Sequence, residues 1–86
     1  MESELFEKLS MIHRHFGNEN QRRKLVEEAR EYIEAENDEE AADVFVVAMQ
    51  LYMNSVEIRK IVKAKVDRTL DRIVSGYYEV DKKILV

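Results

Sequence analysis

Residues 27–43, EEAREYIEAENDEEAAD, carry two pairs of carboxylates, Glu28 with Glu31 and Glu40 with Asp43. In each pair the residues stand three apart, and on a helix this spacing places them on one face with Cβ atoms about 5–6 Å apart. Each pair then holds two anionic groups that repel each other, and a cation between them would relieve the repulsion. The stretch therefore predicts a metal-dependent function.

We predict that a tight helical hairpin joins the two pairs. The helical periodicity of apolar residues stops at Ile33, and Asn37 or Asp38 is a suitable N-cap for a second helix. Asn37 can also take the left-handed conformation that ends a helix. The hairpin decides whether the two acidic pairs meet.

The register of this hairpin depends on the centre of its turn. If the turn is centred between Ala35 and Glu36, Glu28 lies level with Asp43 and Glu31 lies level with Glu40 across the two helices. If it is centred on Asn37, the couples slip by roughly three residues, about 4–5 Å, which long carboxylate side chains can absorb. In either register four carboxylates converge on an all-oxygen site that suits Mg²⁺, with Mn²⁺ as a possible substitute.

The same acids also have a purely structural interpretation. The chain is 37% charged, so carboxylates three residues apart also arise by chance on solvated helix faces. Glu40 stands three residues after Asn37, as a capping box requires, and an acidic first turn suits the helix dipole. Asp43 favours the metal site, because it lies in the apolar run 41–48, where an unpaired buried acid is costly.

The composition predicts one all-α domain. The chain has 86 residues, no proline and two glycines, and we expect a single domain over 1–86 with a C-terminal tail at 77–86 that docks on a neighbour or forms a short strand. The absence of cysteine excludes disulfides and thiolate metal sites. A net charge of −4 makes nucleic-acid binding an unlikely main function. With no signal peptide or membrane span, we expect a soluble, cytoplasmic protein.

Apolar periodicity predicts four helices, at about 2–16, from about 20 to the hairpin turn, at about 38–53, and from 56 to about 75. The third is apolar on nearly every side, which is typical of a buried helix. Three other helices can hardly enclose it, so we predict a homo-oligomer. Gly76 is well placed to end the fourth helix, with Tyr77 packing back on its last turn.

Two groups of residues carry a resemblance to a known family. The run His15-Phe16-Gly17, then Gln21-x-x-Lys24-Leu25-x-Glu27-Glu28-x-x-Glu31 and Glu39-Glu40-x-Ala42-Asp43-Val44, resembles the MazG-like all-α nucleotide pyrophosphohydrolases, especially their short single-domain members. The basic end of that family is similar to Lys65-x-x-Arg68-x-x-x-Arg72-Ile73 and Gly76-Tyr77-Tyr78. Members commonly have a longer connection between the two acidic pairs.

The resemblance implies a bundle-like core of four helices that assembles as a homodimer or homotetramer. It also implies Mg²⁺-dependent hydrolysis of nucleoside triphosphates to monophosphate and pyrophosphate, which keeps the nucleotide pool clean. The family's motif assigns the four carboxylates as metal ligands, and Glu31 or Glu28 would be the catalytic carboxylate that orients or deprotonates the attacking water. The candidate substrate-binding residues are Gln21, Lys24, Lys65, Arg68 and Arg72.

Two other functions are compatible with the sequence. A non-catalytic helical module could keep the family fold and use its last two helices for oligomerisation or partner binding. The complete acidic quartet favours the enzyme, because a degenerate relative is expected to have lost at least one ligand. A nucleic-acid adaptor that uses the basic residues from Arg59 to Arg72 is disfavoured by the net charge.

Overall fold

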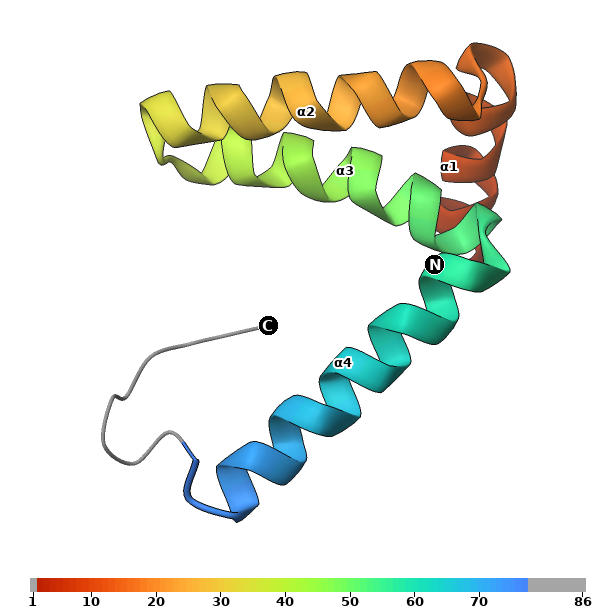
Figure 1. The fold of residues 1–86 in the computed structure, drawn as a ribbon. Helices are drawn as coiled ribbons and strands as arrows, with labels where there is room; N and C mark the ends of the chain where they lie inside the picture. Colours follow the sequence, from red (N-terminus) through yellow and green to blue (C-terminus); the bar gives the residue numbers. More distant parts are fainter. Residues whose placement is uncertain (1, 78–86) are drawn as a thin grey trace. The chain divides into compact units, whose positions relative to one another are not determined.

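The computed structural model describes residues 2–77, and these residues are helical with no strand among them (Figure 1). The helices are α1 (Glu2–Phe16), α2 (Asn18–Ala35), α3 (Asp38–Asn54) and α4 (Val56–Val74). The all-α prediction is confirmed for this part of the chain. The predicted docking or strand formation of the tail from Tyr78 onward lies outside the described residues.

The chain divides into two compact units, Met1–Val56 and Glu57–Val86. The first contains α1, α2 and α3. The second contains α4 from its second residue onward. The prediction of a single domain stays a prediction.

In the first unit α2 and α3 form an antiparallel hairpin and run side by side, and α1 packs against both, mainly against α3 (Figure 1). Among the described residues, the buried apolar side chains are Leu9, Val47 and Leu51. The other fully buried side chains are polar: Gln21, Glu28 and Gln50. The centre of this unit is therefore half polar, which is unusual for so small a core.

The turn between α2 and α3 consists of two residues with complementary roles. Glu36 ends α2 in the left-handed conformation, with φ of 50°, and its backbone N–H donates to the carbonyl of Tyr32. Asn37 is the N-cap of α3, because its side-chain oxygen accepts a hydrogen bond of 2.8 Å from the backbone N–H of Glu40. The N-cap prediction is confirmed, but the left-handed residue is Glu36 rather than Asn37.

The turn is centred between Glu36 and Asn37, and this centre lies between the two registers considered from the sequence. Within each facing couple, Glu28 with Asp43 and Glu31 with Glu40, the two residues are therefore offset by roughly two positions, about 3 Å along the helices. An offset of this size is within the reach of long carboxylate side chains.

Gly17 alone joins α1 to α2. Its backbone has φ of 89° and ψ of 151°, a combination essentially limited to glycine. Its N–H donates to the carbonyl of His13 at 2.8 Å, and its own carbonyl accepts from the N–H of Gln21 at 3.1 Å. The α2 helix consequently begins at Asn18, slightly earlier than the periodicity predicts.

The α4 helix ends in a Schellman motif. Gly76 has φ of 79° and its N–H donates to the carbonyl of Ile73, while the N–H of Tyr77 donates to the carbonyl of Arg72 at 2.8 Å. The guanidinium of Arg72 lies 4.8 Å from the centre of the Tyr77 ring. The predictions for Gly76 and Tyr77 are confirmed.

Apolar side chains of α3 remain exposed. Val47 and Leu51 face the core, whereas Phe45 and Val46 are 61% and 42% exposed. The described chain thus covers one side of a helix that is apolar on most of its surface. No helix within residues 2–77 combines the length and apolarity needed to cross a bilayer.

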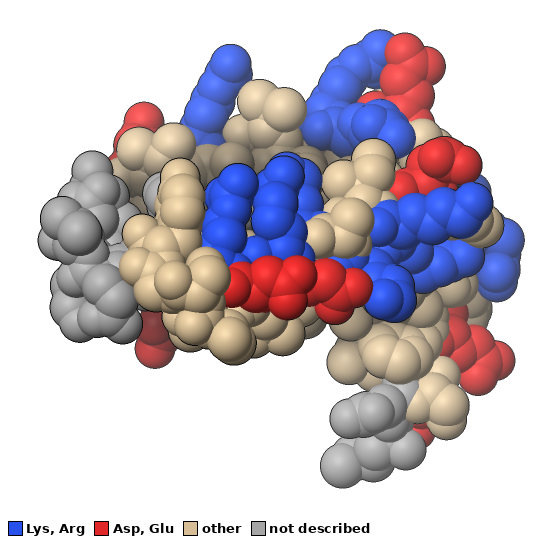
Figure 2. Space-filling model, turned by 60° about the horizontal axis from the view of Figure 1, so that its bottom comes forward, with Lys and Arg blue, Asp and Glu red and all other residues tan. Residues whose placement is uncertain are grey.

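Charged side chains of both signs cover the molecule. On the face drawn in Figure 2, Lys and Arg side chains stand with Asp and Glu side chains among them. On α4 the ammonium of Lys63 pairs with the carboxylate of Asp67 at 2.9 Å. Part of the basic surface predicted for this helix is therefore balanced by acids one turn away.

Candidate metal centre

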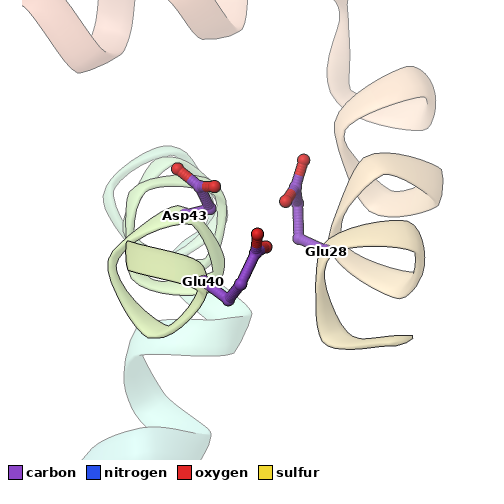
Figure 3. A group of neighbouring side chains, drawn as sticks. All are labelled: Glu28, Glu40 and Asp43. Carbon is purple, nitrogen blue, oxygen red and sulfur yellow. The ribbon is translucent and has the colours of Figure 1, made fainter. Parts of the chain in front are cut away.

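Three of the four predicted ligands meet between α2 and α3. Glu28 reaches across from α2, while Glu40 and Asp43 come from the first turns of α3 (Figure 3). One carboxylate oxygen from each residue lies within 4.8 Å of the others. The spacing prediction is confirmed for these three residues as a cluster that could hold a metal ion.

The cluster contains two carboxylate oxygens in need of a partner. Glu28 is only 7% exposed, and Glu40 is half-buried. Within the described part of the chain, Oε2 of Glu28 and Oε2 of Glu40 are buried and accept no hydrogen bond. Buried carboxylates are normally paired or bound to a metal, because removing them from water is costly. An all-oxygen donor set of this kind fits a hard divalent cation such as Mg²⁺ or Mn²⁺.

Burial and neighbouring negative charges shift the pKa of Glu40. Partial burial raises the pKa of Glu40, and the nearby carboxylates of Asp43 and Glu28 raise it further. Both effects disfavour the charged form of Glu40. A cation bound at the cluster would instead favour the charged form of Glu40.

Glu31 lies beside this cluster without joining it. Its side chain is exposed, and the three-residue group does not include it. A hydrogen bond that the protonated form of Glu31 would donate to Glu28, together with the negative charge of Glu28, raises the pKa of Glu31, with smaller contributions from burial and from the charges of Glu40 and Glu27.

Lys24 provides the only cation paired with the cluster among the ion pairs described. Its ammonium lies 3.0 Å from Oε1 of Glu28 and 3.6 Å from Oε1 of Glu27. The hydrogen bond from Lys24 is the main reason that the pKa of Glu28 is lowered, and the same contact raises the pKa of Lys24. From the sequence we predict that Lys24 binds substrate. In the structure its ammonium pairs with Oε1 of Glu28, while Oε2 of Glu28 is the buried oxygen without a partner.

A pocket of about 510 Å³ adjoins the cluster within the first unit. Its lining includes three acidic residues and two basic ones, namely Glu27, Glu28, Asp43, Arg23 and Lys24. Its apolar wall consists of Ile12, Phe16, Val46 and Val47. The volume lies in the range of small-molecule sites, which are mostly apolar with a few polar groups that orient the ligand.

Two glutamine amides meet on the lining of this pocket. Nε2 of Gln21 donates to Oε1 of Gln50 over 2.9 Å, and the residues are only 6% and 1% exposed. The sequence prediction included Gln21 but missed Gln50. A signal was present, since Gln50 interrupts the apolar run of α3 just as Asp43 does.

The three basic candidates on α4 belong to the second unit. Lys65 and Arg68 are exposed, and Arg72 is half-buried against Tyr77. Their role in substrate binding stays a prediction.

Comparison with protein-family models, with curated proteins and with solved structures returns no match to this chain. The resemblance to the MazG-like family therefore stays a hypothesis that rests on the quoted residues.

Proposed function

We propose that this chain is a MazG-like enzyme that hydrolyses nucleoside triphosphates to nucleoside monophosphate and pyrophosphate with Mg²⁺. The observation that carries the proposal is the convergence of Glu28, Glu40 and Asp43 beside a pocket, with two of their oxygens buried and unpaired. An acidic cluster repels an anionic ligand unless a cation lies between them. A polyphosphate is the kind of substrate that brings a cation with it.

The proposed roles follow from the position of each group. Glu28, Glu40 and Asp43 would hold the metal, with Asp43, the most exposed of the three, nearest to incoming substrate. Mg²⁺, when bound, neutralises phosphate oxygens and makes a water more acidic. Lys24 could turn from Glu28 to a phosphate once another cation balances that carboxylate.

Glu31 is the best candidate for the general base. Its raised pKa brings it closer to the pH at which a base exchanges protons efficiently. In the proposed step, the oxygen of water bonds to the α-phosphorus and the bond from the α-phosphorus to the bridging oxygen breaks. The bridging oxygen leaves with pyrophosphate, and the proton from water passes to Glu31.

A homodimer or homotetramer is the proposed assembly. On α3, Phe45 and Val46 are exposed, and none of the described side chains of α4 is buried. The exposed apolar residues of α4 include Ile61, Val66, Leu70 and Ile73. Apolar surface of this extent usually marks a protein contact. Light scattering at micromolar concentration should report a dimer or tetramer, and a stable monomer would refute this part of the proposal.

The same apolar surface favours the second candidate function, a non-catalytic helical assembly module. That function would need neither a metal nor the pocket. Two buried carboxylate oxygens without a partner would then be an unexplained cost. A test of the site itself separates the two functions.

The test measures pyrophosphate release from a panel of ribo- and deoxynucleoside triphosphates with Mg²⁺, Mn²⁺ or EDTA. Glu40→Gln removes one candidate ligand, and Glu39→Gln is the matched control, because Glu39 is exposed and outside the cluster. We expect metal-dependent release that falls at least about 100-fold in Glu40→Gln, as expected when a group that stabilises transition-state charge is removed. The control should keep its activity. No release from any nucleotide, with no Mg²⁺ binding by calorimetry, would favour the assembly module.

A further inference from the structure

We propose that the Gln21–Gln50 amide pair recognises the nucleobase and separates keto bases from amino bases. This inference rests on the proposed function, because it assigns the amide pair in this pocket to the base of the same substrate. The pair is the most buried polar group on the pocket lining.

The lining of the pocket contains groups that suit each part of a nucleotide. A metal held by Glu28 and Asp43, two acidic residues of the lining, would bind phosphates. Lys24 adjoins these acidic residues through its ion pair with Glu28. Phe16 and Val46 contribute apolar surface, which suits the faces of a flat heteroaromatic ring. A volume of about 510 Å³ can accommodate a nucleoside.

The amide pair gives this apolar part a fixed polar pattern. A glutamine amide has two N–H donors and an oxygen acceptor, so one shared hydrogen bond leaves most of that capacity unused. With Nε2 of Gln21 bonded to Oε1 of Gln50, the groups left for a ligand include the acceptor Oε1 of Gln21 and the donor Nε2 of Gln50. Burying two amides for packing alone is unfavourable compared with apolar residues of similar size.

An acceptor and a donor held in a fixed order discriminate between base edges. On the Watson–Crick edge of guanine and thymine the exocyclic group accepts and the ring nitrogen donates, whereas adenine and cytosine have the reverse order. Enzymes that bind an isolated base recognise it through this edge. A pocket that matches one order leaves its own buried groups unpaired with the other, which is how a polar site rejects an analogue.

The experiment compares kcat/KM for dGTP, dTTP, dATP and dCTP. The main variant is Gln21→Leu with Gln50→Leu, because replacing both partners by apolar groups of similar size can be nearly neutral for stability. The control is Asn20→Ala, which removes another amide from the lining but lies outside the pair. Circular dichroism and thermal unfolding verify that each variant folds.

We expect the wild type to separate the keto group from the amino group by about 5- to 150-fold, the range for a bidentate base contact. The double variant should reduce the separation to within about threefold, while Asn20→Ala keeps it. If the double variant does not fold, Gln50→Glu keeps the acceptor for Gln21 and removes the donor, so it should also alter the ranking. A wild type without this separation, or a double variant that retains it, would overturn the inference.

Calorimetric binding of the four deoxynucleoside monophosphates distinguishes failure of the inference from failure of the proposed function. In one outcome the four monophosphates bind with different affinities, the double variant loses this difference, and no triphosphate releases pyrophosphate. That outcome would refute the reaction but support base recognition. Release of pyrophosphate at equal rates from all four triphosphates would support the reaction and refute base recognition. Binding of none of the monophosphates would refute base recognition as well.

Discussion

Substituting Asn37 by alanine should weaken both the fold and the metal site. The side chain of Asn37 makes one hydrogen bond, of 2.8 Å, to the backbone N–H of Glu40 at the start of α3. Replacing an N-cap residue by alanine costs about 0.5–2 kcal/mol, and because this bond is exposed to water we expect about 1 kcal/mol. For a domain of this size, that loss lowers Tm by about 4–8 °C.

The effect should reach the metal site because the capped turn carries a ligand. Glu40 supplies both the N–H that Asn37 caps and a carboxylate of the cluster. When the first turn of α3 frays, Glu40 is held less firmly, so the rise in Tm on adding Mg²⁺ should be smaller in Asn37→Ala than in wild type.

Asn37→Ser is the matched control, because serine caps helices about as well as asparagine. Chemical and thermal unfolding, with and without Mg²⁺, give both quantities on the same samples. If the alanine and serine variants have equal stability, the cap does not stabilise the hairpin. If they differ in stability but gain equally from Mg²⁺, the link between the cap and the metal site is wrong.

Two further predictions concern the backbone and the charges. Gly17→Ala should destabilise the protein by about 1–3 kcal/mol in chemical unfolding, because φ of 89° with ψ of 151° is strained for alanine, although the added Cβ would meet no atom within 4 Å. An unchanged midpoint would contradict that view of the α1–α2 junction. In EDTA, the pKa of Glu40 and of Glu31 is raised above 4.5 in the folded state, so the fold holds protons that the unfolded chain releases. Stability from these groups should therefore decline as pH rises from about 4.5 towards neutral. The decline should be shallower in Glu40→Gln than in Glu39→Gln, and equal slopes would show that the cluster does not cause it.

The local features of the hairpin could be predicted from the sequence because they depend on neighbouring residues. The N-cap role of Asn37 follows from its side chain and from its place before a new apolar run. The left-handed residue could not be predicted in the same way, because Glu36 has no intrinsic preference for positive φ. Its conformation is fixed by the need of α2 to end and α3 to begin within two residues.

The candidate site could be predicted only in part, because it depends on the register between helices. A difference of one residue in the turn centre changes which residues of the two helices lie level, and the observed cluster contains Glu28 but not Glu31. The contact of Lys24 with Glu28 is local, four residues apart on one helix, but from the sequence we predict only a substrate contact for Lys24. The contact between Gln21 and Gln50 joins two helices, so only the folded structure reveals it.

The distribution of buried residues connects the fold to the proposed function. Gln21, Glu28 and Gln50 are about as deeply buried as the apolar core residues, which are Leu9, Val47 and Leu51. In so small a unit, apolar residues at these positions would add buried apolar surface and remove unpaired polar atoms, so they would be expected to stabilise the fold. Positions where a sequence departs from the most stable choice are those where function is expected to outweigh stability. All three residues line one pocket, which places that departure at the acidic cluster and at the amide pair rather than at random in the core.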